Sequence, residues 1–320
     1  MDMYQKRKMR QENKKENNNK ESLSKVVINW YPGHMAKTRR QIIEDLKLID
    51  IVVELIDSRI PISSRNPDIQ NITKNKKKVI ALNKSDLADI NETNKWVSYF
   101  EKQGIPAVIT DSNSGKGIQD VIKTIENIMQ TELQELANKG RVGRTIRIMV
   151  LGIPNVGKSS FINRIAKKTS LEVGNRPGVT RNKQWIRVSD KIELLDTPGV
   201  LWPKFESEKV ALNLAYTGTI KDDVIEKVEI AFNLLKYLLA NYKNSVLNRY
   251  SFDETEIEEI LSRDEYPENE NIYEIMQLIG KKRGAIVSGG KIDDAKVANI
   301  IIDDYRSGKF GRITLEKVEK

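Results

Sequence analysis

The chain has 320 residues, more than one average domain, and its 39% hydrophobic and 31% charged content is typical of a globular protein rather than a disordered one. Its apolar runs are far shorter than the roughly 20 residues of a membrane-spanning helix, and the lack of cysteine excludes disulfides and thiolate zinc sites, so a cytoplasmic protein is expected. The net charge of +9 favours a polyanionic partner such as RNA over a membrane.

The first 25 residues are polar and basic with almost no apolar side chains, which predicts a disordered basic tail over 1–25. From 26 to 205, short apolar runs alternate with helical periodicity, which predicts an α/β domain with a parallel-rich sheet flanked by helices. The expected strands are Ile51–Ile56, Lys78–Leu82, Ala107–Thr110, Ile146–Leu151, Gln184–Val188 and Ile192–Leu195. A polar segment from about Thr131 to Arg144 is expected to be a connection.

After Pro203 the strand pattern stops, and apolar residues recur at spacings of three and four. We therefore expect an all-α domain over 206–320. Its predicted helices include Glu254–Leu261, Asn271–Lys282 and Asp293–Tyr305. This region is net acidic, with 17 basic and 22 acidic side chains, so the positive charge belongs to the front of the chain.

A phosphate-binding loop follows the strand Ile146–Leu151. It reads Gly152-Ile153-Pro154-Asn155-Val156-Gly157-Lys158-Ser159 and precedes an apparent helix, the setting that a P-loop requires. Its backbone amides wrap the phosphates, Lys158 neutralises their charge, and the Ser159 hydroxyl ligates Mg²⁺. We expect the nucleotide to contact Asn155, Val156, Gly157, Lys158, Ser159 and Ser160, with Lys158 also catalytic.

Asn155 has a second expected role in this loop. Its side-chain carbonyl can ligate K⁺ beside the phosphates, where a cation offsets charge that develops during hydrolysis. The alternative is a loop asparagine that bonds its own backbone.

A guanine-recognition motif, Asn83-Lys84-Ser85-Asp86, follows the strand Lys78–Leu82. The Asp86 carboxylate can accept hydrogen bonds from the ring N–H and the exocyclic amine of guanine, a pair of donors that adenine lacks. Asn83 and Lys84 complete the motif, although these four residues taken alone also fit an ordinary turn. Ser112-Asn113 lies where the base-packing loop of such proteins belongs, with a degraded sequence.

Two further motifs complete the set. Asp196-Thr197-Pro198-Gly199 follows the strand Ile192–Leu195 and offers Asp196 to Mg²⁺ and the Gly199 amide to the γ-phosphate. Thr180 is the expected switch residue for Mg²⁺ and γ-phosphate, with an exposed turn threonine as the alternative. Because the base motif precedes the P-loop, the chain is predicted to be a circularly permuted GTPase that binds GTP or GDP.

The sequence closely resembles the bacterial ribosome biogenesis GTPase A family, in the YlqF/YawG group of circularly permuted GTPases. The resemblance runs from about Ile28 to Glu316. Beyond the nucleotide motifs it rests on Trp30 to Lys37, Asp57-Ser58-Arg59-Ile60-Pro61, Lys282-Arg283-Gly284, Ser288-Gly289-Gly290 and Arg306-Ser307-Gly308-Lys309.

This resemblance implies a late assembly factor of the large ribosomal subunit that contacts ribosomal RNA and proteins, hydrolyses GTP on the particle and is then released. It further implies that His34, the only histidine, orients the attacking water. Thr180 and Gly199 are expected to be catalytic through their contacts with the γ-phosphate. A packing or helix-capping role for His34 is the alternative.

The expected partner excludes DNA and membranes, and a monomer is expected. RNA contacts would come from Lys281-Lys282-Arg283 and from Arg306, Lys309 and Arg312, unless these are solvated helix ends. Two other functions stay open: a GTP-dependent RNA-binding module whose hydrolysis is incidental, and a GTPase with a protein partner only.

Overall fold

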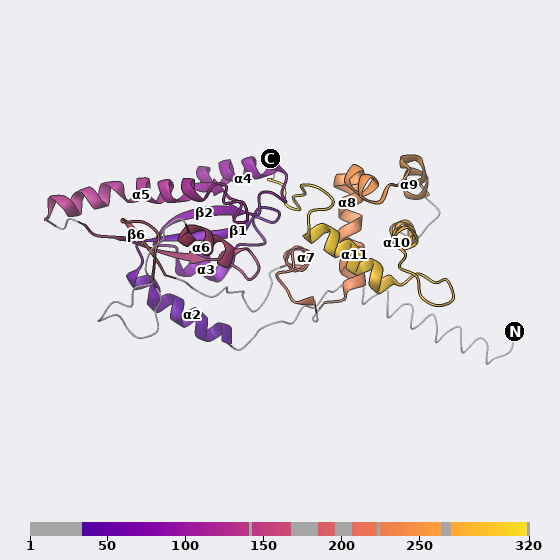
Figure 1. Ribbon diagram of the computed structural model, residues 1–320, viewed down its shortest axis with the longest axis horizontal. Coiled ribbons are helices and arrows are strands. Elements are labelled where there is room, and N and C mark those ends of the chain that lie inside the picture. The colour runs from indigo at the N-terminus through magenta and orange to yellow at the C-terminus, as the bar shows by residue number, and fades with distance from the viewer. Residues whose placement is uncertain are drawn as a thin grey trace.

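The computed structural model describes residues 34–140, 143–167, 185–195, 207–222, 225–263 and 270–318. Its described strands form one sheet in the order β3-β2-β1-β4-β6-β5, in which β5 is antiparallel to β6 and the other neighbours are parallel (Figure 1). The expected α/β architecture is confirmed. The strands are β1 (Ile51–Asp57), β2 (Lys77–Asn83), β3 (Ala107–Ile109), β4 (Ile146–Leu151), β5 (Trp185–Arg187) and β6 (Ile192–Leu195).

Helices cover both faces of the sheet. They are α2 (His34–Asp45), the 3-10 turn η1 (Leu46–Leu48), α3 (Pro67–Ile72), α4 (Ile90–Lys102), α5 (Ile118–Asn138) and α6 (Lys158–Lys167). Successive strand side chains point to opposite faces. On β1, Val53 and Leu55 therefore join the cluster of α5 and α6, whereas Val52 packs with α2 and α3 and Ile56 packs with α4. All seven β1 residues are buried in consequence.

Helix α5 corrects one expectation. The segment from Thr131 was predicted to be a connection, but the helix continues to Asn138 and the connection begins only at Lys139. Residues 131–138 are rich in glutamate, leucine, glutamine and alanine, which have high helix propensity, so a polar stretch here extends a helix rather than ending it.

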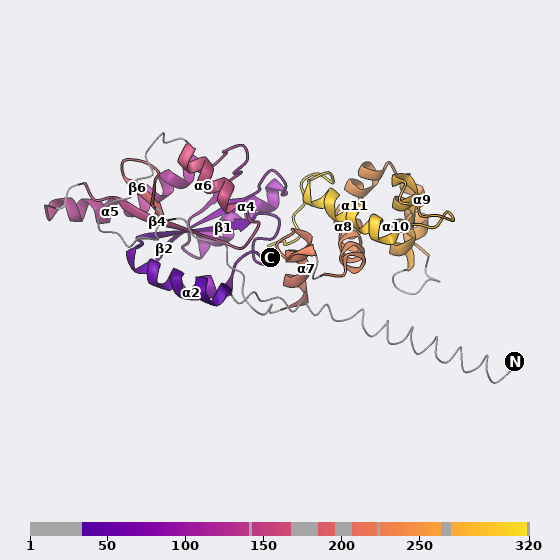
Figure 2. The ribbon, with the colours of Figure 1, turned by 60° about the horizontal axis from the view of Figure 1, so that its bottom comes forward.

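A second, helical region follows, and this part of the predicted fold is also confirmed. It comprises α7 (Glu208–Tyr216), α8 (Lys227–Tyr250), α9 (Glu254–Leu261), α10 (Glu270–Arg283) and α11 (Asp294–Arg306). In both ribbon views α7 lies between the sheet and α8, and so occupies the junction of the two parts (Figures 1 and 2). Among the described helices, none is long and apolar enough to cross a membrane.

The residues after α11 return to the loops that follow β1 and β2. Ile313 N donates to Leu87 O at 2.9 Å, and Leu315 N donates to Arg59 O at 2.8 Å. Trp96 of α4 donates from Nε1 to Glu316 O at 2.9 Å. The C-terminal segment after the helical region therefore packs on the first part of the molecule.

Candidate functional site

The parallel strands bring the predicted motifs to one edge of the sheet. Asn83 is the last residue of β2, Ser112 follows β3, and the phosphate-binding loop follows β4. Since β1 to β4 are parallel neighbours, their carboxyl ends meet there, where open α/β sheets bind ligands. A cleft of about 640 Å³ opens at this edge and is lined by Asn83, Lys84, Leu87, Asp111, Ser112, Asn113, Ile153, Pro154, Asn155, Gly157, Lys158, Ser159, Ser160, Arg59, Thr217 and Arg306.

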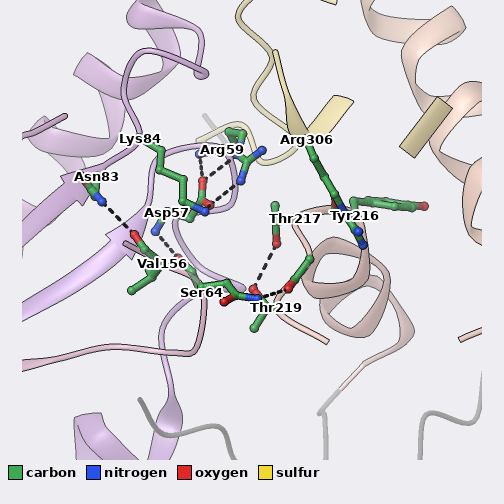
Figure 3. Close-up of polar contacts among 12 residues, drawn as sticks. Asp57, Arg59, Ser64, Asn83, Lys84, Val156, Tyr216, Thr217, Thr219 and Arg306 are labelled. Atoms are coloured by element: carbon green, nitrogen blue, oxygen red, sulfur yellow. Dashed lines mark hydrogen bonds and ion pairs between the residues drawn. The ribbon is translucent and has the colours of Figure 1, made fainter. Parts of the chain in front are cut away.

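Asn83 joins the base motif to the phosphate-binding loop. Its Nδ2 donates to Val156 O at 2.8 Å (Figure 3), across 73 residues of sequence. Its Oδ1 accepts hydrogen bonds from Ser112 N at 3.0 Å and Ser112 Oγ at 2.7 Å. One buried amide therefore holds three separate motifs of the sequence together.

The phosphate-binding loop itself requires glycine at Gly157. Its φ of 96° lies in the left-handed region, and a Cβ there would stand 2.4 Å from Asn83 Nδ2. Helix α6 begins directly afterwards at Lys158, so its free amides and positive dipole end face the cleft, together with the side chains of Lys158, Ser159 and Ser160. The loop can therefore bind a polyphosphate.

Asp86 is the residue expected to recognise the base. It lies three residues after the end of β2, and its exposed side chain is not among the residues that line the cleft. Val156 does not line the cleft either. Its side chain is buried, and only its carbonyl takes part, by accepting the hydrogen bond from Asn83. Partial burial and the charge of Asp111 raise the pKa of Asp86. Asn113 lines the cleft, and its backbone N–H donates to Asp111 Oδ1 at 2.8 Å.

A buried charge cluster lies beneath the cleft. Asp57 Oδ2 is 2.8 Å from Arg59 Nη2 and 3.1 Å from Lys84 Nζ (Figure 3). Burial alone would raise the pKa of Asp57, but the charges of Arg59 and Lys84 outweigh it and hold that pKa well below its usual range. Lys84, in a left-handed conformation with φ of 57°, is thus fixed by Asp57 at the side of the cleft.

Sequence reasoning missed two contributors from outside the predicted G domain, Thr217 and Arg306. Both line the cleft, although they come from the helical region. No local motif marks them, because their position depends on how the two parts pack. Arg306 was expected to contact RNA, but its guanidinium is bound to Asp222 and to the end of α7. Lys309 of the same predicted cluster pairs with Asp304 at 3.1 Å.

Three predicted site residues, and the side chain of a fourth, lie outside the part of the chain that the structure describes. Thr180, Asp196 and Gly199 lie outside the described residues. His34 is the first residue of α2, and its side chain lies outside the description as well. In both ribbon views the N-terminal end of α2 points toward the side where α7 lies (Figures 1 and 2).

Comparison with known proteins assigns the family. A family model described as "50S ribosome-binding GTPase" matches residues 147–275, which begin in β4 just before the phosphate-binding loop. Ribosome biogenesis GTPase A of Bacillus pumilus is 47% identical over 294 residues, covering 92% of this chain and 100% of that protein. The chain belongs to the ribosome biogenesis GTPase A family.

Other members agree with this assignment. Ribosome biogenesis GTPase A of Bacillus licheniformis is 46% identical over 92% of this chain and 99% of its own. The solved structure described as GDP-bound TM YlqF has a TM-score of 0.64 and 25% identity, covering 88% of this chain and 100% of that one. A GNP-bound YlqF from T. maritima has a TM-score of 0.59, again at 25% identity over 88% of this chain and 98% of that one. As a GTPase of this family, the protein binds guanine nucleotides.

Proposed function

We propose that this GTPase binds GTP with Mg²⁺ in the cleft, docks on an immature large ribosomal subunit, and leaves after hydrolysing GTP to GDP and phosphate. The observation that carries the proposal is the Asn83 side chain, which joins the base motif, Ser112 and the phosphate-binding loop into one site. Family membership supports the large subunit as the partner, since the matching model is described as ribosome-binding.

In the cleft each residue has a distinct proposed role. Asp86 accepts hydrogen bonds from the guanine edge. It does so from the loop after β2, and its exposed side chain turns toward the base when the nucleotide binds. Lys158 neutralises phosphate charge, and the amides at the start of α6 hold the phosphate oxygens. Mg²⁺ would be held by Ser159, Thr180 and Asp196, and its chemistry is to neutralise charge between the β and γ groups.

Hydrolysis requires a water to be oriented beside the γ-phosphate. We assign this to His34, with the Gly199 amide and Thr180 holding the phosphate. Neutral imidazole accepts a hydrogen bond from water at cellular pH, because its unperturbed pKa is roughly 6.5. Asn155 is the proposed K⁺ ligand. Its side-chain nitrogen donates to Gly218 O, and the side-chain oxygen on the other arm of the same amide would bind the ion.

The proposed RNA contacts lie on the helical region. Lys281, Lys282 and Arg283 form the last turn of α10, and the turn that follows exposes Ile286 and Val287. Between residues 275 and 292 there is no acidic side chain, although the helical region as a whole is net acidic. Such a local basic surface suits a phosphate backbone. A monomer in the cytoplasm fits this role.

The test uses a protein that binds GTP but hydrolyses it slowly. His34→Ala should keep its nucleotide affinity, while turnover stimulated by large subunits falls about 100-fold, the usual effect of losing an acid–base or positioning group. We expect this variant to stay on precursor particles in cells. Ready release would instead favour an RNA-binding module whose hydrolysis is incidental, and unchanged stimulated turnover would leave His34 a structural residue.

A further inference from the structure

Helix α7 ends against the phosphate-binding loop. At its C-terminus Gly218 N donates to Ala215 O at 3.1 Å and Thr219 N donates to Leu214 O at 2.9 Å, the pair of bonds that defines a Schellman motif. Gly218 takes the left-handed conformation that this motif requires, with φ of 74°. Its own carbonyl accepts a hydrogen bond from Asn155 Nδ2 at 2.6 Å. The helical region therefore touches the loop that is to hold the phosphates.

Arg306, at the end of α11, fastens this helix end. Its Nη2 donates to Ala215 O at 2.8 Å and its Nε donates to Tyr216 O at 3.2 Å. A cation is favoured there because the last carbonyls of a helix carry the negative end of its dipole, and a carbonyl oxygen can accept a second hydrogen bond. The other edge of the guanidinium pairs with Asp222 at 2.9 and 3.2 Å.

Gly218 and Arg306 are also in close packing. A Cβ on Gly218 would stand 3.3 Å from both Cζ and Nε of Arg306, so the guanidinium packs closely against this turn. Figure 3 shows the Arg306 side chain running beside Tyr216 at the end of this helix. Arg306 thereby fixes where the Gly218 carbonyl meets the phosphate-binding loop.

The contact determines how Asn155 is oriented. Asn155 lines the cleft and has a left-handed backbone, with φ of 59°. Its amide is planar, so holding Nδ2 on Gly218 also fixes the direction of Oδ1. The orientation of this side chain at the phosphates consequently depends on a turn in the helical region.

We propose that Arg306 is a positioning residue for nucleotide binding, which acts through the Thr217-Gly218-Thr219 turn on Asn155. Arg306 need not touch the nucleotide, since the turn carries its effect. Coupling free energies are reciprocal, so a bound nucleotide in turn stabilises the packing of α7 and α11 on the cleft. The proposal rests on the proposed function in one respect, that the cleft takes a guanine nucleotide.

A double-mutant cycle tests this directly. The dissociation constant of a fluorescent GDP analogue with Mg²⁺ is measured for the unchanged protein, Arg306→Gln, Asn155→Ala and the double variant. We expect Arg306→Gln to weaken binding about fivefold, the size of one net hydrogen bond. In the Asn155→Ala background the same change should have almost no effect, because the residue through which Arg306 acts is gone. Arg306→Lys, which keeps a cation at the helix end, should restore part of the affinity.

Arg249 provides a matched control. It makes the same two-bonded pair with a carboxylate on α11, Asp304, at 2.8 and 2.8 Å, and it is not among the described residues that line the cleft. Arg249→Gln should leave GDP affinity unchanged, and thermal unfolding shows whether each variant is folded. If Arg306→Gln does not fold, Asp222→Asn is used instead, which weakens the pairs of Asp222 with Arg306 and Lys227 but keeps the bonds of Arg306 to α7. It must show a smaller loss that again vanishes in the Asn155→Ala background.

Two results would overturn the inference: unchanged affinity in the folded Arg306 variant, or equal losses with and without Asn155. Either would leave the proposed function intact. If the unchanged protein failed to bind GDP, the proposed function itself would be wrong, and the inference would fall with it.

Discussion

Asp57 lies between two cations under the nucleotide cleft, and its replacement tests whether this cluster stabilises the fold. Asp57→Asn keeps the side-chain shape but removes the charge that faces Arg59 and Lys84, and Arg59 is almost fully buried. Removing one partner of a buried pair costs about 3–5 kcal/mol. We expect the free energy of unfolding to fall by that amount in a denaturant titration.

The control for Asp57 is an exposed pair. Asp190→Asn breaks a surface contact with Arg187 and should cost under about 1 kcal/mol. The pKa of Asp57 also fixes how its contribution to the free energy of unfolding changes with pH. Because the folded pKa of Asp57 lies below its ordinary value of 3.8, its contribution to stability is present above that pH and is lost as the pH falls further. If Asp57→Asn and Asp190→Asn lowered the free energy of unfolding equally, the buried cluster would have no stabilising role.

Asp86 tests base recognition. Asp86→Asn exchanges an acceptor for a donor, so preference should move from guanine toward xanthine nucleotides by about two orders of magnitude. In the unchanged protein, burial and then Asp111 raise the pKa of Asp86. Guanine binding needs the ionised carboxylate, so GTP affinity should begin to fall at a less acidic pH than for an ordinary aspartate. Competition assays across pH measure both effects, and equal competition by ATP would contradict guanine recognition.

At the scale of elements, Glu316 links the C-terminal segment to both parts of the molecule. Its buried carboxylate accepts hydrogen bonds from Ile62 N at 2.6 Å, from Ser63 N and Ser63 Oγ, and from Asn213 Nδ2 of α7 at 3.1 Å. Glu316→Ala would leave these donors without their acceptor. Unsatisfied buried groups cost about 1–3 kcal/mol each, so we expect a loss of at least 2 kcal/mol in the free energy of unfolding.

The matched variant for Glu316 is Glu256→Ala, on the exposed face of α9. It should change the free energy of unfolding by less than about 0.5 kcal/mol. If the two glutamates behave alike, the C-terminal segment does not hold the parts together.

Local pattern predicted most elements of this fold. β4, β6 and α9 begin and end at the expected residues, because alternating apolar runs and helical periodicity are local signals. The error in α5 arose where composition was polar but helix propensity was high. The contacts of Ile313 and Leu315 with the loops after β2 and β1 were not predictable, since a short irregular segment carries no periodicity that reveals its distant partner.

The same distinction applies to the site. The phosphate-binding loop and Asn83 were recognisable because their spacing reflects chemistry with a nucleotide. Arg59 could have been suspected from its place directly after a buried strand. Arg306 and Thr217 could not, because they enter the cleft only through the packing of α7 and α11.

For the whole molecule, the cleft lies where the sheet and the helical region meet. Residues of both parts line it, and α7 contacts the phosphate-binding loop through Gly218. A change in nucleotide at this junction can therefore alter how the helical region is held. A ligand shifts such an equilibrium only by its differential affinity for the two arrangements. Binding to the ribosomal particle should consequently differ between the GTP and GDP forms.

The most direct test of this account is sedimentation of the purified protein with large ribosomal subunits in a non-hydrolysable GTP analogue, in GDP and without nucleotide. We predict that the protein travels with large subunits in the analogue, that GDP reduces this binding at least tenfold, and that small subunits bind little in any state. Added salt should weaken the complex if phosphate contacts contribute to it. Equal binding to large subunits in the analogue and in GDP, or none in either, would contradict the claim that nucleotide state controls attachment to the large subunit.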